Sequence, residues 1–267
     1  MTKNLKLSGR DHPEQDTSAQ LFDWAHRELS QSLTDSNIHV WCASLERTSQ
    51  ESAELFSLLS ADEKARAERF YFERDRNRYI SGRGLLRGIL SGYLEMEASQ
   101  IEFVYGDQGK PALKSGVKDK VLEFNLSHSR DLALYILSWN RKVGIDVEYI
   151  RPMADMDDLA DQFFTAPESA LINSLFDDQK REIFYKIWTC KEAYLKALGT
   201  GLTSPLDQVE IALGPERAVT LMSRNGYKYE GWHLGLLNPQ ENYQGAFAIA
   251  GSDLKIVYQS VDRQGKF

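Results

Sequence analysis

Two acidic residues, Asp146 and Glu148, have the types and spacing of metal ligands. They alternate with apolar residues in the segment 144–148, GIDVE, so in a strand both carboxylates point to one face. Two positions along a strand span roughly 6.6 Å, close enough for both carboxylates to bind one ion. Oxygen ligands suit magnesium, which commonly also bridges to phosphate, and manganese could take its place. Alternatively, the pair is the solvated face of an amphipathic strand.

A third carboxylate and a cation lie on one face of a helix predicted over residues 180–198. Trp188, Glu192 and Lys196 follow one another at intervals of four residues, which places them in a row along the helix. Glu192 could complete the metal site that the two strand carboxylates begin. Lys196 could stabilise the charge on a leaving phosphate. In isolation, a Glu–Lys pair at this spacing is an ordinary surface ion pair.

Cations precede these motifs along the chain. The run between Asp62 and Arg87 contains Lys64, Arg66, Arg69, Arg74, Arg76, Arg78, Arg83 and Arg87. Guanidinium forks suit phosphate geometry, although the acidic residues between them favour a solvated face for part of this run. Further on, the segment 125–129, NLSHS, ends a predicted strand, and His128 could donate to a phosphate there.

The predicted elements would bring these motifs together in an α+β fold. Segment 79–93 aligns without a gap with segment 187–201, and each reads as an apolar helix with basic residues that runs into small residues. This suggests two similar halves, residues 38–140 and 141–267, with a ligand cleft between them. Residues 1–37 form a polar extension with one amphipathic run, 21–33. We predict strands at 38–45, 101–105, 121–125, 133–138, 143–148, 209–213, 219–222, 229–237 and 243–250. We predict helices that begin at Ser60 and that span 75–94, 167–176 and 180–198.

The composition excludes several classes of function. A net charge of −7 gives no global attraction to nucleic acid or to an anionic membrane. Cys42 and Cys190 are the only cysteines, and they form no CxxC pair that would predict a zinc site. No stretch approaches the roughly 18 apolar residues of a membrane span, and the charged N-terminus does not read as a secretory signal. We therefore expect a cytoplasmic protein.

The motifs also follow the order of a known family. A basic helix, Gly109-Lys110-Pro111, the segments 125–129 and 144–148, and the helical segment 188–197 together resemble the long, surfactin-synthetase-activating type of 4′-phosphopantetheinyl transferase. The resemblance covers about residues 39–250. It implies a monomer that binds coenzyme A between two similar α+β halves related by a pseudo-twofold axis. Such an enzyme transfers phosphopantetheine to a carrier-protein serine and releases 3′,5′-ADP. Fatty-acid, polyketide and peptide-synthetase carriers all remain open as partners.

The resemblance implies a role for each candidate residue. Asp146, Glu148 and Glu192 would hold magnesium together with pyrophosphate oxygens. Lys196 would stabilise the departing oxygen, and the serine proton would pass to Glu192, to a metal-bound water or to Glu168. The expected coenzyme A contacts are Arg66, Arg78, Arg83, Arg87, Lys110, Pro111, Ser127, His128 and Lys191.

One position departs from the family pattern, and two other functions stay open. Glu63 stands where the family has a lysine, which calls the phosphate contact at that position into question. A magnesium-dependent phosphoesterase or nuclease would also use clustered carboxylates, but it would hydrolyse a nucleotide without a protein acceptor. A non-catalytic module that binds coenzyme A or a carrier protein is the remaining alternative, and it would not need a complete carboxylate set.

Overall fold

The order of the elements repeats along the chain. A computed structural model describes residues 32–116, 119–200, 206–214, 218–223, 230–252 and 254–261. Each half begins with a strand, continues through three helices and a small hairpin, and ends with a pair of antiparallel strands. The first half contains β1 (Asn37–Ser44), α1 (Ser49–Ser57), α2 (Ala61–Ala67), α3 (Glu73–Leu94), β2 (Phe103–Tyr105), β3 (Pro111–Leu113), β4 (Leu122–Ser129) and β5 (Leu132–Trp139).

The second half has the same arrangement and is followed by one more strand. It contains β6 (Val143–Tyr149), α4 (Met156–Phe163), α5 (Ala166–Asn173), α6 (Asp177–Leu198), β7 (Val209–Leu213), β8 (Val219–Ser223), β9 (Trp232–Leu237) and β10 (Tyr243–Ala250). The additional strand is β11 (Lys255–Ser260), and it pairs in parallel with β1. The last strand of the described residues therefore belongs to the sheet of the first half.

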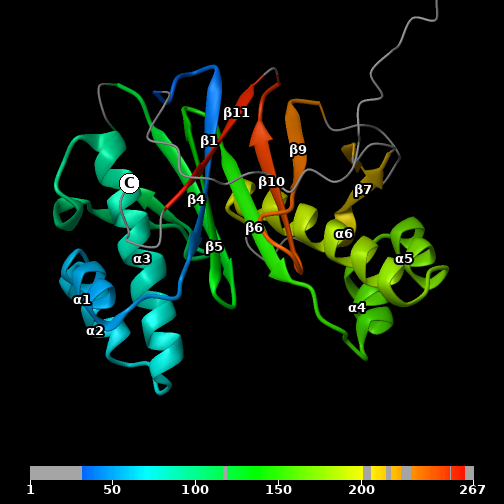
Figure 1. Cartoon of the computed structure of the whole chain (residues 1–267). Coiled ribbons are helices and arrows are strands. Elements are labelled where there is room, and N and C mark those ends of the chain that lie inside the picture. The colour runs from blue at the N-terminus through cyan, green and yellow to red at the C-terminus, as the bar shows by residue number, and fades with distance from the viewer. Residues whose placement is uncertain are drawn as a thin grey trace, which may run out of the picture.

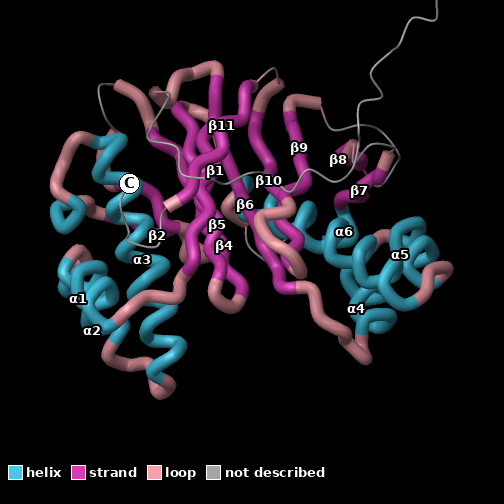
Figure 2. The backbone as a smooth tube through the Cα atoms, viewed as in Figure 1, coloured by secondary structure: helices cyan, strands magenta, loops and turns pink. Residues whose placement is uncertain are grey.

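Two sheets form the centre of the molecule, and helices cover their outer faces (Figure 1 and Figure 2). The first sheet has the order β11-β1-β5-β4, and the second has the order β6-β10-β9. Their apolar inner faces share one cluster of buried residues, to which Val40, Leu134, Ile145 and Phe247 belong. Alternate residues of each strand face the helices, as the two-residue period of a strand requires. Thus Tyr135 packs in the cluster that contains α3.

Local sequence signals set the ends of the helices that carry the site. Ser60 and Glu63 form a capping box at the start of α2, because each side chain reaches the backbone of the other residue. Helix α6 ends at Gly199, whose φ of 76° lies in the left-handed region that glycine adopts without strain. Gly144 lets α6 approach β6 closely, because a Cβ at this position would overlap the Ala193 carbonyl oxygen and the Ala197 backbone nitrogen.

The α+β class expected from the sequence is confirmed, and most predicted elements are present. Helices α1 and α4 and strands β3 and β11 were not predicted. β4 is longer than predicted, because it continues through the 125–129 segment instead of stopping before it. The amphipathic run at 21–33 falls almost entirely outside the described residues. Within the described part of the chain, we find no helix with the length and apolarity needed to cross a membrane.

Candidate active site

Polar side chains join the two sheets where β4 and β6 run side by side. These strands are edge strands of different sheets, so no backbone ladder connects them. Side chains of β4 take its place, because they accept hydrogen bonds from the backbone N–H groups of β6. The Asn125 Oδ1 atom accepts from Ile145 at 2.9 Å, and the Ser129 Oγ atom accepts from Tyr149 at 3.1 Å. Ser127 lies between them and accepts from Val147 at 3.4 Å. The 125–129 segment thus fixes where β6 presents its carboxylates.

The same two serines donate to the carboxylates of β6. Ser127 Oγ lies 2.8 Å from Asp146 Oδ1, and Ser129 Oγ lies 2.9 Å from Glu148 Oε2. Lys196 on α6 completes this cluster, with its Nζ 2.6 Å from Asp146 Oδ1 and 2.9 Å from Ser127 Oγ. Ser127, expected to contact coenzyme A, is only 7% exposed, and its hydroxyl is hydrogen-bonded to Asp146 and Lys196.

Two carboxylate oxygens in this cluster have no partner. Asp146 Oδ2 and Glu192 Oε1 are buried, and among the described residues neither finds a hydrogen bond. A buried carboxylate oxygen without a partner is costly, and a cation would satisfy it. The pKa of Glu192 is raised by burial first and then by the charges of Asp146 and Glu148. The pKa of Glu148 is raised by burial and by Asp146. The three acidic groups are thus close enough to repel one another.

The expected convergence of all three carboxylates on one ion is not present. Within the described residues, no group of three or more His, Cys, Asp or Glu side chains is arranged to hold a metal. Magnesium is usually held by only one or two carboxylates together with substrate phosphates and water. The unpartnered oxygens of Asp146 and Glu192 fit such a site, and Lys196 supplies the positive charge next to it.

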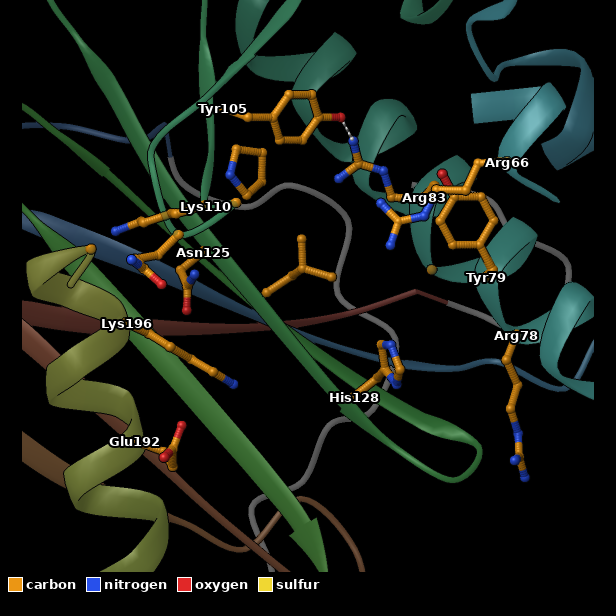
Figure 3. Close-up of a pocket in the computed structure, with 16 residues that line it drawn as sticks. Arg66, Arg78, Tyr79, Arg83, Tyr105, Lys110, Asn125, His128, Glu192 and Lys196 are labelled. Atoms are coloured by element: carbon orange, nitrogen blue, oxygen red, sulfur yellow. Dashed lines mark hydrogen bonds between the residues drawn. The ribbon is translucent and has the colours of Figure 1, made fainter. Parts of the chain in front are cut away.

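A cavity of about 550 Å³ extends from this cluster across to the first half of the chain (Figure 3). Glu192 and Lys196 of α6 form one side, and Arg66 of α2 with Arg83 of α3 lies on the opposite side. We call this the first cavity. Its lining includes the expected residues Arg66, Arg78, Arg83, Lys110, Pro111, His128, Glu192 and Lys196. Sequence reasoning did not assign Tyr79, Tyr105, Gln108 and Asn125, which also line it.

Not every cation of the first cavity is free for a ligand. Arg78 donates to Asp131 Oδ1 at 2.8 Å. The Lys110 ammonium donates to the backbone oxygens of Val143, at 3.1 Å, and Ala197, at 3.4 Å, so it ties the 106–110 loop to the second half. Burial lowers the pKa of Lys110. The pKa of His128 is lowered by burial first and then by the positive charges of Lys196 and Arg78.

A second cavity of about 480 Å³ lies next to Glu148 and Ser129. Its walls are largely aromatic and aliphatic, with Tyr149, Met153, Leu159, Phe184, Tyr185 and Trp188, and two arginines, Arg130 and Arg151, also line it. Glu148 faces this second cavity whereas Glu192 faces the first, so the carboxylate cluster stands between the two. One signal for this cavity is present in the sequence, because Trp188 shares a helix face with Glu192.

Three expected site residues, Arg87, Lys191 and Glu168, are buried away from both cavities. Arg87 is 1% exposed and donates to Glu63 Oε2 and to the carbonyls of Ala98 and Ile101. It lines neither cavity, so its position does not favour the expected contact with a nucleotide phosphate.

Lys191 and Glu168 form a buried ion pair with a Nζ–Oε2 distance of 2.7 Å. Lys191 Nζ also donates to the backbone oxygens of Leu206 and Val209, and Glu168 accepts from the backbone nitrogens of Thr165 and Ile211. Every contact is internal to the second half of the chain. Both side chains are thus engaged inside the second half and line neither cavity, which does not favour the coenzyme A contact expected of Lys191 or the base expected of Glu168.

Comparison with known proteins identifies the family of this chain. A family model described as "4'-phosphopantetheinyl transferase superfamily" matches residues 142–248, and one described as "4'-phosphopantetheinyl transferase, N-terminal" matches residues 44–138. The chain is 42% identical over 228 residues to 4'-phosphopantetheinyl transferase HetI of Nostoc sp. PCC 7120, covering 85% of this chain and 94% of that protein. It is 30% identical over 174 residues to 4'-phosphopantetheinyl transferase Sfp of Bacillus subtilis, covering 65% of this chain and 75% of Sfp.

The alternatives of a phosphoesterase and of a non-catalytic binding module find no support in these matches. The two family models together span both halves of the fold, including the strand and the helix that carry the acidic cluster. The chain therefore belongs to the 4′-phosphopantetheinyl transferase family, whose enzymes transfer phosphopantetheine to carrier proteins.

Proposed function

We propose that the enzyme takes phosphopantetheine from coenzyme A and attaches it to a serine of an apo carrier protein, with a divalent ion bound at the acidic cluster. The observation that carries this proposal is the pair of unpartnered buried oxygens, Asp146 Oδ2 and Glu192 Oε1, beside the Lys196 ammonium. A site with two open carboxylate oxygens and one lysine suits a magnesium-bound diphosphate.

The two cavities fit the two ends of the donor. The nucleotide would occupy the first cavity, where the Lys110-Pro111 segment and the tyrosines line the walls and arginines stand at the far side. The pyrophosphate would lie near Lys196 and His128. The pantetheine chain, which is largely uncharged, would extend into the second cavity over Phe184 and Trp188.

Magnesium, or manganese in its place, would be held by Asp146 and Glu192, with Glu148 beside them. When bound, the ion offsets the charge of the pyrophosphate. Lys196 then has a defined task, because its ammonium is already fixed by Asp146 and Ser127 and can bind the phosphate oxygen that leaves. A fixed donor needs no reorganisation as negative charge develops.

In the reaction, the carrier serine oxygen bonds to the phosphorus that bears pantetheine, and the bond from this phosphorus to the 3′,5′-ADP oxygen breaks. The serine proton needs an acceptor. The buried ion pair of Glu168 with Lys191 supports Glu192 as the acceptor among the carboxylates first considered. Glu192 has two oxygens, so one can contact the ion while the other accepts the proton. Burial raises its pKa, which favours proton uptake.

The proposal includes a monomeric enzyme that works in the cytoplasm on apo carrier proteins. Cys42 and Cys190 are both free thiols, which is in keeping with a reducing compartment. Burial raises the pKa of both thiols, so neither is an activated nucleophile.

The test is mass spectrometry of several apo carriers after incubation with the enzyme, coenzyme A and magnesium. We expect one carrier serine to gain the mass of one phosphopantetheine, with equimolar release of 3′,5′-ADP. Mixtures without a carrier should release none. Release of 3′,5′-ADP at the same rate with and without carrier would instead show a phosphoesterase, and would contradict the proposal.

A further inference from the structure

The β2–β3 hairpin of the first half forms part of the wall of the first cavity, to which it contributes Tyr105 and residues 108–111. Among the described strands, β2 and β3 pair only with each other and join neither main sheet. A two-stranded hairpin on its own is marginally stable. The position of this wall therefore depends on the side chains that fix the hairpin to the rest of the molecule.

Side chains fix the hairpin to both halves of the chain. On the side of the first half, the Phe103 ring packs against the Phe124 ring, with their centroids 5.8 Å apart. On the side of the second half, Lys110 Nζ donates to the backbone oxygens of Val143, at 3.1 Å, and Ala197, at 3.4 Å. Within the described residues, these are the only hydrogen bonds that join the hairpin to the second half.

The Lys110 ammonium has the surroundings of a structural cation. Its hydrogen bonds go to carbonyls, and Ala197 lies in the last turn of α6, where carbonyls lack helical partners and carry partial negative charge. Burial lowers the pKa of Lys110, and the charge of Glu123 opposes this shift. Figure 3 shows the side chain running from the hairpin toward α6, away from Arg66 and Arg83. The ammonium is therefore directed at the protein rather than at the centre of the cavity.

The bonds of Lys110 fall where α6 and β6 meet. Val143 is the first residue of β6, and Gly144 after it lets α6 approach closely. The stem of the lysine lies beside Gly199, since a Cβ at Gly199 would be 3.7 Å from Lys110 Cδ. The helix that ends here also carries Glu192. One side chain thus links the hairpin wall of the first cavity to the helix that contributes to the acidic cluster.

We infer that Lys110 is a positioning residue, which holds the β2–β3 hairpin against the donor nucleoside at a fixed distance from α6. The inference rests on the proposed function, because it assumes that coenzyme A lies in the first cavity. In this role Lys110 acts on coenzyme A through the hairpin, whereas the sequence led us to expect a direct contact. A hairpin that is already fixed loses little freedom when the nucleotide binds, so the anchor favours binding without touching the donor.

The first test is Lys110→Met, which removes the ammonium and keeps most of the stem. In transfer to one apo carrier, KM for coenzyme A should rise about tenfold, because the fraction of enzyme with the hairpin in place falls by about that factor. The kcat value should stay within about threefold of wild type. Lys110→Arg can still donate to both carbonyls and should recover part of the loss. Lys114→Met is the matched control, since Lys114 in the same hairpin pairs with the exposed Glu102.

A change of donor separates an anchor from a general loss of stability. The donor 1,N6-etheno-coenzyme A carries an enlarged base, which a wall held at a fixed distance should disfavour. The ratio of kcat/KM for coenzyme A to that for the etheno donor should therefore fall about threefold or more in Lys110→Met. An enzyme that is merely less stable, or that has lost a contact with a phosphate common to both donors, would keep the wild-type ratio.

Hydrogen exchange tests the anchor without any ligand. The backbone amides of Gly106 and Gly109 are hydrogen-bonded within the 106–110 loop. In Lys110→Met they should exchange faster than in wild type, by about tenfold, because the hairpin opens more often. Exchange in β5 should stay as in wild type, which shows that the change is local.

The outcomes separate the inference from the proposed function. Unchanged exchange in the loop would overturn the inference, and so would an unchanged donor ratio in a Lys110→Met enzyme that still transfers phosphopantetheine. Either result would leave the proposed function intact. A wild-type enzyme that modifies no carrier with either donor would contradict the proposed function, and the exchange measurement would still decide whether Lys110 anchors the hairpin.

Discussion

Lys196 Nζ lies 2.6 Å from Asp146 Oδ1, which joins the last turn of α6 to β6 at the acidic cluster. The lysine is 30% exposed and the aspartate 4% exposed, so the pair connects a buried carboxylate to the edge of the first cavity. Asp146 has a second oxygen with no partner. One carboxylate thus orients Lys196 and, in the proposed reaction, offers its other oxygen to the metal ion.

We predict that Lys196→Ala lowers kcat by about a hundredfold, the order expected on loss of one donor to a developing oxyanion. Affinity for coenzyme A should fall much less, because the arginines and the Lys110-Pro111 segment still bind the nucleotide. Steady-state kinetics gives kcat, and calorimetric binding of coenzyme A in the absence of a carrier gives the affinity separately. Lys186→Ala is the control, since Lys186 on the same helix pairs with the exposed Glu182. A variant with normal kcat and a weakened affinity for coenzyme A would show that Lys196 contributes only to the binding of coenzyme A.

Gly144→Ala should lower both stability and activity. A methyl group there would overlap the backbone of α6 at Ala193 and Ala197, so the helix must move away from β6 and carry Glu192 and Lys196 with it. We expect a loss of about 1–3 kcal/mol in the free energy of unfolding, as for other overpacked sites. Urea denaturation and transfer assays check both effects. Gly92→Ala is the matched control, because Gly92 lies in α3 with open space around it and alanine favours a helix. Equal behaviour of the two variants would refute the close-approach argument.

Glu168→Gln should destabilise the enzyme without removing its chemistry. The change leaves the Lys191 ammonium buried beside a neutral amide, which costs about 3–5 kcal/mol for a buried pair that loses one charge. Activity per folded molecule, measured at low temperature with an active-site titration, should stay near wild type. If kcat collapses while the urea midpoint is unchanged, Glu168 is the base after all.

His39 should make the stability of the first half depend on pH. The Tyr93 hydroxyl accepts a hydrogen bond from Trp41 Nε1, so its own proton is available for His39 Nδ1, 2.6 Å away. His39 Nδ1 can accept this proton only when the imidazole ring is neutral. Burial lowers the pKa of His39 from 6.5 to about 4. The unfolded chain therefore binds more protons between these values, and stability falls as pH falls.

Between pH 7 and pH 5 this group should remove roughly 2 kcal/mol from the free energy of unfolding. The measurement is urea denaturation at both pH values for wild type and for His39→Gln, which cannot titrate. The variant should lose less stability over this interval. Equal losses in the two proteins would mean that His39 is not held neutral.

The sequence predicted the strand and helix that carry the acidic cluster because their patterns are local. The alternation around Asp146 and Glu148 sets the face of β6, and the four-residue interval from Glu192 to Lys196 sets the face of α6. The ends of α2 and α6 followed from the Ser60 capping box and from Gly199, which are also local signals.

Contacts between side chains that lie far apart in the sequence could not be predicted from such local patterns. Arg83 and Arg87 both lie on α3, yet one reaches a cavity and the other is buried, and this depends on how Glu63 of α2 packs against them. Lys191 lies one residue before Glu192 and so points about 100° away from it around the helix, toward the 206–209 segment. β11 was missed because its pairing with β1 joins the two ends of the described chain.

The most direct test of the central claim is transfer by Asp146→Ala and Glu192→Gln, assayed by mass spectrometry of an apo carrier with coenzyme A and magnesium. Both variants should fold, as judged by circular dichroism and urea midpoint, and both should leave the carrier unmodified while wild type converts it fully. Carrier modification at the wild-type rate by either folded variant would contradict the assignment of these carboxylates to the metal and the diphosphate.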